Sequence, residues 1–293
     1  MRRSASVPRA ATVLLYMPLG FSSTKASWRA NVRFMCMAMA LALVAGLLGV
    51  QPPTESRAAP SISGLHVHGN QILNGDGQPV VLHGVDRSGT EYACIQGWGI
   101  FDGPSDAASV QAIASWSVNA VRMPLNEDCW LGINGVDPAY AGANYQSAIA
   151  SYVNLLNSNG LVAILDLHWT APGDVPATGQ QPMPDEDHSV AFWRQVAAAY
   201  QGNSSVIFDL FNEPFPDSNQ DTTDGWTCWR DGGTCTGVSF QVAGMQQLVT
   251  TVRDVGATNV IMLGGLEYAN ALSQWLTYEP ADPSGNLAAS WHV

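Results

Sequence analysis

Basic residues are scarce in this chain. It carries 12 lysines and arginines against 24 aspartates and glutamates. Seven of the 12, including the only lysine, Lys25, lie before residue 60, which leaves five basic against 23 acidic residues beyond Ala58. A surface of this charge repels phosphate backbones and anionic lipids. We therefore expect no nucleic-acid partner, no stable membrane association of the mature part, and a neutral or cationic substrate.

Residues 1–59 differ in composition from the rest of the chain. Arg29 and Arg33 lead into the apolar run 34–50, which is followed by Ser56-Arg57-Ala58, with small residues at both cleavage-determining positions. This order predicts a signal peptide within an extended N-terminal region, and hence a secreted, extracellular protein. The alternative is an uncleaved membrane anchor, because the 17 residues of the apolar run are at the lower limit for a spanning helix.

Cysteine is also rare, and only Cys94, Cys129, Cys228 and Cys235 lie beyond the N-terminal region. An even number of cysteines in a secreted protein predicts two disulfides, although four cysteines permit three pairings. Cys228 and Cys235 flank a turn at residues 231–233, and Cys94 and Cys129 each follow a predicted strand on neighbouring loops. A zinc site is the alternative, but no two of these cysteines have its close spacing, so we expect no metal.

Residues 60–293 repeat one pattern, a short apolar strand followed by a polar or aromatic loop and an amphipathic helix. The predicted strands are 80–85, 120–125, 162–167, 206–211, 260–263 and 288–293. The predicted helices are 107–117, 141–157, 189–200 and 240–255. Before them, residues 65–81 alternate around Gly69-Asn70 and predict a β-hairpin that caps the domain.

A glycine-rich phosphate-binding turn is absent after the first predicted strand. Six α/β units fit either an open doubly wound sheet or part of a barrel, and the missing turn favours the barrel. Polar residues at the ends of nearly all strands favour it too, since a barrel gathers them at one mouth. We therefore predict an α/β fold, a (β/α)8 TIM barrel that is C-terminally truncated after about strand 6, because eight units are needed.

The apolar run 206–211 ends on Asn212-Glu213-Pro214, and the proline holds Glu213 extended. An ordinary strand-ending turn is the alternative reading of this tripeptide. Polar or aromatic residues also mark other strands, namely Arg122, His168, Trp169, Glu267 and His292. An arginine within the apolar segment 120–124 would be buried and needs a carboxylate partner. Its alternative explanation is a structural ion pair with a neighbouring strand.

Four motifs together resemble glycoside hydrolase family 5, the large cellulase family of (β/α)8 barrels. They are IFDLFNEP at residues 207–214, AVRMP at 120–124, LDLHW at 165–169 and SWH at 290–292. The resemblance extends over residues 65–293, so it defines residues 60–293 as a catalytic domain. It implies a retaining β-glycosidase that needs no cofactor.

The resemblance also implies roles for individual residues. Glu213 would be the general acid/base, and Asn212 would bind near the sugar 2-hydroxyl and the nucleophile. Arg122 would orient the nucleophile, and His168 and His292 would line the subsite at the scissile bond.

The family's pattern continues beyond His292 with a tyrosine, a nucleophilic glutamate after strand 7 and a tryptophan after strand 8. The sequence stops at Val293, so we expect the domain to be incomplete, its nucleophile to be missing and this fragment to be inactive. Glu267 is the other carboxylate at a strand end, and we interpret it as a substrate contact.

Tryptophans near strand ends suit the stacking of sugar rings. We assign Trp98, Trp169 and Trp275 to substrate binding, and Trp116 and Trp193, within predicted helices, to the core. The resemblance favours an endo-β-1,4-glucanase that acts on a neutral polysaccharide as a monomer. A β-mannanase or another β-glucanase of the family is the alternative. A non-catalytic carbohydrate-binding protein and a metal-dependent hydrolase that uses both histidines are the alternatives from other classes.

Overall fold

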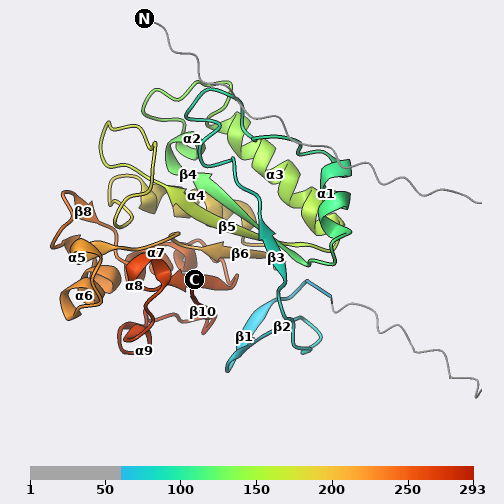
Figure 1. Ribbon diagram of the computed structural model, residues 1–293. Helices are drawn as coiled ribbons and strands as arrows, with labels where there is room; N and C mark the ends of the chain where they lie inside the picture. Colours follow the sequence, from blue (N-terminus) through green and yellow to red (C-terminus); the bar gives the residue numbers. More distant parts are fainter. Residues whose placement is uncertain (1–60) are drawn as a thin grey trace, which may run out of the picture. The chain divides into compact units, whose positions relative to one another are not determined.

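Six parallel strands form the main sheet of the computed structural model, which describes residues 61–293. The predicted signal peptide and N-terminal region, residues 1–59, lie outside the described residues. The strands are β3 (Gly84–Asp86), β4 (Ala120–Asn126), β5 (Val162–Trp169), β6 (Val206–Asp209), β9 (Ile261–Gly264) and β10 (Leu287–Ser290). They lie side by side in chain order (Figure 1). A parallel sheet that grows in one direction without reversal is typical of a barrel, so the structure contains a partial barrel.

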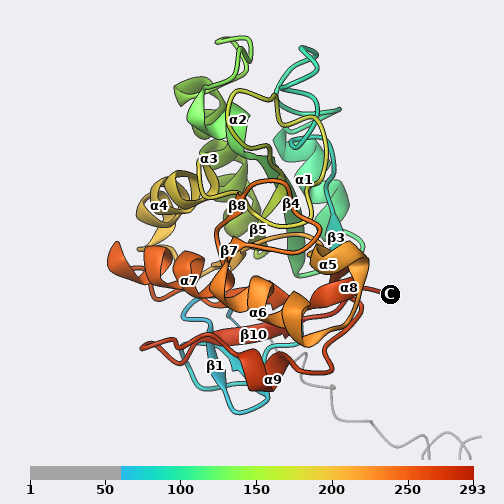
Figure 2. The same ribbon diagram turned by 90° about the vertical axis from the view of Figure 1, so that its left-hand side faces the viewer.

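Helices connect these strands and cover the sheet. The longer ones are α1 (Ala107–Ala114), α3 (Ala143–Ser158), α4 (Ser189–Tyr200), α6 (Thr223–Asp231) and α7 (Met245–Asp254). Short ones are α2 (Glu127–Leu131), α5 (Pro216–Asn219), α8 (Leu266–Ala269) and α9 (Trp275–Tyr278). Figure 2 shows α3, α4 and α7 following one another along the sheet. Among residues 61–293, no helix has both the length and the apolar character needed to cross a bilayer.

Side chains along each strand alternate between two environments. One set of positions packs against the helices in the larger apolar cluster. On the other face, Ala120, Ile164 and Ile207 belong to a smaller apolar cluster. Two residues further along, this same face carries Arg122, Asp166 and Asp209. The inner face of the sheet therefore changes from apolar to charged toward the C-terminal ends of its strands.

The predicted hairpin is formed by β1 (His66–His68) and β2 (Gln71–Leu73), which pair antiparallel. The N–H of Leu65 donates to the carbonyl of Ser204, just before β6, at 3.3 Å. The N–H of Val67 donates to Oδ1 of Asn286, just before β10, at 2.6 Å. Because both acceptors precede strands, the hairpin caps the N-terminal end of the sheet, which confirms the prediction.

The structure differs from the sequence-based expectations in one helix boundary, one additional helix and one core assignment. The predicted helix 240–255 begins only at Met245, because Gln241–Val242 forms strand β8, which pairs with β7 (Gly233–Thr234). Helix α6 was not predicted, since its sequence is poor in helix formers; Thr222 caps its first turn by accepting from the N–H of Gly225. Trp116 lies beyond the end of α1 and its side chain is 64% exposed, so its assignment to the core is wrong.

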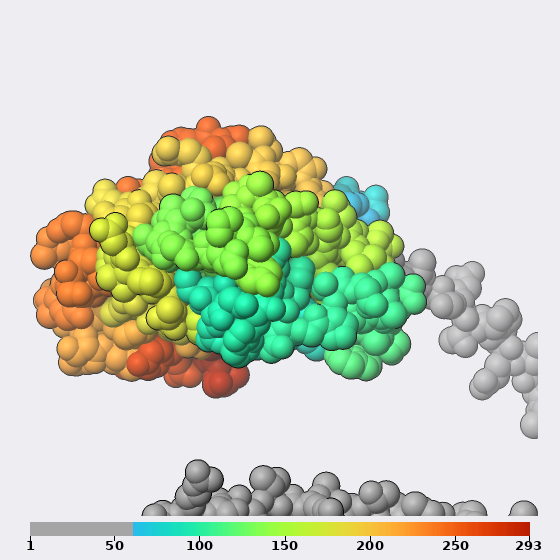
Figure 3. All heavy atoms as spheres, turned by 90° about the horizontal axis from the view of Figure 1, so that it is seen from above, coloured from blue at the N-terminus to red at the C-terminus, as the bar shows by residue number. Residues whose placement is uncertain are grey.

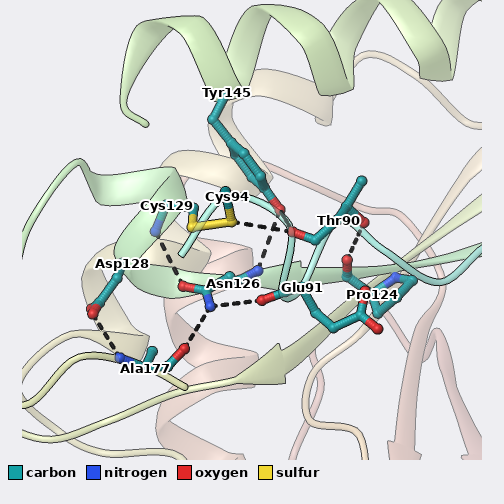
Figure 4. The surroundings of a disulfide bond; sticks show 9 residues. All are labelled: Thr90, Glu91, Cys94, Pro124, Asn126, Asp128, Cys129, Tyr145 and Ala177. Atoms are coloured by element: carbon teal, nitrogen blue, oxygen red, sulfur yellow. Dashed lines mark hydrogen bonds between the residues drawn. A yellow bond between two sulfur atoms is a disulfide. The ribbon is translucent and has the colours of Figure 1, made fainter. Parts of the chain in front are cut away.

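Both predicted disulfides are present, and within residues 61–293 this pairing leaves no cysteine thiol for the zinc alternative. Cys94 bonds to Cys129, which joins the loop after β3 to α2 (Figure 4). Cys228 bonds to Cys235 across the turn after α6. Beside the first disulfide, Nδ2 of Asn126 donates to the carbonyls of Glu91 and Ala177, both at 2.8 Å. The loops after β3, β4 and β5 therefore lie against one another (teal, green and yellow in Figure 3).

Removing the disulfide that spans the longer sequence should destabilise the protein more. Cys94 and Cys129 are 35 residues apart, whereas Cys228 and Cys235 are 7 apart. Chain-entropy arguments give about 4 kcal/mol for loss of the first and about 2.5 kcal/mol for loss of the second. Chemical unfolding of the two Cys→Ala double variants measures the difference, after peptide mapping without reduction has verified the bridges. A larger loss for the shorter loop would contradict this prediction.

Candidate functional site

A pocket of about 590 Å³ opens at the C-terminal ends of the sheet strands. Five of the predicted site residues line it together: Arg122, His168, Asn212, Glu213 and His292. They come from four different strands or from the residues that directly follow them. The structure thus brings together side chains that lie as far as 170 residues apart in the sequence.

Arg122 is held by carboxylates of neighbouring strands. Its Nε and Nη2 donate to one oxygen of Asp209 at 3.0 and 2.9 Å, and Nη2 lies 3.0 Å from a carboxylate oxygen of Asp166. The exposed Asp86 lies 3.6 Å from Nη1. Burial lowers the pKa of Arg122, but Asp166 and Asp209 raise it by more, so the guanidinium stays charged. Among residues 61–293, the carboxylate partners of Arg122 are Asp86, Asp166 and Asp209. They match the alternative explanation, a structural ion pair with neighbouring strands.

The two buried aspartates share this one arginine. Asp166 and Asp209 are direct partners on β5 and β6, and both side chains are at most 1% exposed. The pKa of Asp209 is raised to about 6, because burial and the charge of Asp166 raise it by more than the charge and hydrogen bonds of Arg122 lower it. Neither aspartate was identified as a site residue from the sequence. The spacing of two residues beyond Ile164 and Ile207 was the available signal, since it puts both on the inner face.

Asp166 also fixes the tautomer of His168. Nδ1 of His168 lies 2.6 Å from the second carboxylate oxygen of Asp166, and because an ionised carboxylate only accepts, this nitrogen donates. Burial lowers the pKa of His168, but the charge and hydrogen bond of Asp166 raise it by more. The other ring nitrogen, Nε2, is left for the pocket.

Asn212 and Glu213 follow β6 and enter the pocket side by side. Oδ1 of Asn212 accepts from Nη2 of Arg122 at 3.0 Å, and the Asn212 side chain is buried. Oε1 of Glu213 lies 3.1 Å from Nδ1 of His292, and the Glu213 side chain is 33% exposed. A carboxyl group that is partly exposed to a pocket and contacts an imidazole can donate and accept protons there.

Besides Asp166 and Asp209, two more residues of the site region were not identified from the sequence. Glu91, in the loop after β3, lines the pocket and accepts from the N–H of Gly89 at 2.6 Å. Burial raises its pKa, more than that backbone hydrogen bond lowers it. Gln180, in the loop after β5, accepts from Nδ2 of Asn212 at 3.0 Å. Neither lies in a periodic segment, so no pattern singled them out.

The predicted substrate contacts divide into two groups. Trp169 and the 66% exposed Trp98 both pack against Tyr92, with ring centroids 6.1 and 5.8 Å apart. Trp275 is instead buried, and its Nε1 donates to the carbonyl of Leu263 at 3.1 Å. Its assignment to substrate binding is therefore corrected to a place in the core. Glu267 lies in α8 and is not among the residues that line the pocket around Glu213.

The alternative of a metal-dependent hydrolase requires a group of metal ligands. Within residues 61–293, no three His, Cys, Asp or Glu side chains are arranged to hold an ion.

Residues 73–293 match the sequence model of a family described as cellulase (glycosyl hydrolase family 5). The chain is 26% identical over 151 residues to endoglucanase MaCel5A of Microbulbifer sp. (strain ALW1), which covers 51% of this chain and 26% of that protein. It is 24% identical over 199 residues to a mannan endo-1,4-beta-mannosidase of Streptomyces lividans, which covers 66% of this chain and 43% of that protein. The chain thus spans less than half the length of either relative.

A solved structure shows the same fold. The endocellulase of Pyrococcus horikoshii in complex with cellotetraose superposes with a TM-score of 0.58 at 20% identity. The superposition covers 79% of this chain and 70% of the endocellulase. At this identity the likeness concerns the fold.

Replacing Asp166 by asparagine should lower the pKa of His168, because a neutral amide no longer stabilises the imidazolium. An NMR titration of the imidazole resonances measures the change. Asp86→Asn, which removes an exposed carboxylate of the same pocket, is the control and should leave the titration unchanged.

The same substitution should change how stability depends on pH. A histidine with a raised folded-state pKa stabilises the fold below its ordinary value of 6.5, and this contribution is lost as the pH rises through the folded-state value. Asp166→Asn should flatten the dependence in that window. An unaltered His168 titration in Asp166→Asn would refute the electrostatic coupling.

Proposed function

The chain belongs to the cellulase family, glycosyl hydrolase family 5, and from this premise we propose that it is a retaining endo-β-1,4-glucanase. The observation that carries the proposal is the position of Glu213. Its carboxyl group lies in the pocket, 3.1 Å from His292 and directly after an amide that Arg122 holds. An acid/base residue needs this combination of access to substrate and polar neighbours.

The proposed reaction has two steps. Glu213 donates its proton to the glycosidic oxygen while a carboxylate attacks the anomeric carbon, and it then takes a proton from the water that releases the sugar. Asn212 gives one amide hydrogen to Gln180 and keeps the other for the sugar 2-hydroxyl, whose hydrogen bond strengthens in the transition state. Nε2 of His168 would bind a neighbouring hydroxyl, since Nδ1 is engaged by Asp166.

We propose a β-1,4-glucan as the substrate, such as cellulose or a soluble derivative. The similarity to an endoglucanase supports this choice, and the exposed aromatic cluster of Tyr92, Trp98 and Trp169 suits a flat sugar face. Mannan is the second candidate, because a mannan endo-1,4-beta-mannosidase is a relative of similar identity. Reducing-sugar release from carboxymethylcellulose and from mannan, measured under the same conditions, distinguishes the two.

We propose that the protein acts outside the cell. Two disulfides among the described residues support an oxidising compartment. The predicted signal peptide lies outside the described residues. Sequencing the N-terminus of secreted protein tests the proposal, and a mature start near residue 59 is expected.

We propose further that the catalytic domain is a complete (β/α)8 barrel and that residues 61–293 do not supply its nucleophile. Retaining hydrolysis needs a second carboxyl group about 5 Å from the acid. Of the other carboxylates that line the pocket, Asp86 lies 3.6 Å from Arg122. Glu91 is buried and accepts from the N–H of Gly89.

Glu213→Gln should lower kcat on cellulose by about a hundred- to ten-thousandfold, because the general acid is lost. Oligosaccharide binding, measured by calorimetry, should stay close to that of the unchanged protein. Turnover of an activated aryl glycoside should suffer less, since its leaving group needs less protonation. Glu267→Gln, outside the pocket, is the matched control and should retain activity. Equal loss on both substrates would argue against the acid role.

Residues 59–293 should show no measurable turnover of carboxymethylcellulose when compared with the product of the full gene. The physical reason is the second carboxyl group that retaining hydrolysis requires. Comparable turnover by the two proteins would place the nucleophile within residues 59–293. Asp86→Asn and Glu91→Gln, which change the other two carboxylates that line the pocket, would then identify it.

A further inference from the structure

Gln180 bridges the two residues that the proposed chemistry uses at the end of β6. Its Oε1 accepts from Nδ2 of Asn212 at 3.0 Å, and its Nε2 donates to the backbone carbonyl of Glu213 at 2.8 Å. One side chain thus contacts both the side chain of the amide residue and the backbone of the acid. Gln180 is not among the residues that line the pocket.

The direction of every hydrogen bond in this chain of contacts is forced by its two ends. The guanidinium of Arg122 can only donate, and the backbone carbonyl of Glu213 can only accept. Between them, Asn212 must present Oδ1 to Arg122 and Nδ2 to Gln180. Gln180 must then present Oε1 to Asn212 and Nε2 to Glu213. The amide orientation of Asn212 is therefore fixed from both sides.

The loop that carries Gln180 is attached on both sides of this residue. The N–H of Ala177 donates to Oδ2 of the buried Asp128 at 2.8 Å (Figure 4). The carbonyl of Pro182 accepts from the N–H of Phe215 at 2.9 Å, just after Glu213. Gln180 thus lies on a short segment that is attached at both ends. Its own position is therefore fixed, and its hydrogen bonds can hold Asn212 and Glu213 in place.

We propose that Gln180 is a positioning residue, which holds Asn212 with one amide hydrogen directed to substrate and holds the peptide of Glu213 beside it. The proposal rests on the function proposed above. Without Gln180, Asn212 keeps its bond to Arg122 but can rotate its NH2 group away from the sugar 2-hydroxyl. Because that hydroxyl is bound most strongly in the transition state, the cost falls on kcat.

Three variants of the protein expressed from its full gene test the proposal. Gln180→Ala removes both hydrogen bonds. Gln180→Glu keeps an acceptor for Asn212 and loses the donor to Glu213. Gln181→Ala is the matched control, because within residues 61–293 the side chain of Gln181 makes no hydrogen bond.

Two readouts are measured, and the first is independent of catalysis. The side-chain amide of Asn212, assigned in an NMR spectrum through its loss in Asn212→Asp, should exchange its hydrogens about tenfold faster in Gln180→Ala. It should stay protected in Gln180→Glu and Gln181→Ala. The second readout is turnover, for which Gln180→Ala should lower kcat about tenfold with little change in KM.

The outcomes separate this proposal from the proposed function. Unchanged exchange of the Asn212 amide in Gln180→Ala would overturn the positioning role, as would a raised KM at constant kcat. Faster exchange in a protein whose parent cleaves neither glucan nor mannan would reject the proposed function and keep the positioning role. If Gln180→Ala does not fold, Gln180→Glu decides: a protected Asn212 amide supports the proposal, and an unprotected one overturns it.

Discussion

The sheet depends on one arginine between two aspartates that are direct neighbours on adjacent strands. Like charges opposite each other destabilise a sheet, and buried charges are costly unless they are paired. Arg122, on β4, forms ion pairs with both aspartates, so one charge cluster joins β4, β5 and β6 in a fixed register. With its contact to Asn212, the same guanidinium connects this cluster to the residue that precedes Glu213.

The pocket residues are consequently positioned by the sheet more than by loops. Asp166 uses one oxygen for Arg122 and the other for His168, so the tautomer of the histidine follows from the same cluster. Gln180 adds a constraint from the loop after β5. Groups that are held by rigid elements need little reorganisation when charge develops in a reaction, which suits the acid/base role proposed for Glu213.

Apolar runs made the strand centres and the order of the α/β units predictable, and the ends of those strands revealed five pocket residues. Features that depend only on tertiary contacts could not be predicted. The apolar run did not tell which strands would supply the partners of Arg122, because Asp166 and Asp209 lie 44 and 87 residues away in sequence. Residue type alone could not separate the buried Trp275 from the exposed Trp98. Gln180 sits in an irregular loop, where no periodicity exists to read.

The attachment of the hairpin has a consequence for how the protein is made. The hydrogen bond between Val67 and Asn286 joins residues that are 219 positions apart. A ribosome adds about 5 to 20 residues each second, so at least about ten seconds pass between the synthesis of Val67 and that of Asn286. Contacts of such long range form slowly, and apolar surface that stays uncovered meanwhile favours aggregation. The first segment of the domain to be synthesised is therefore among the last to dock.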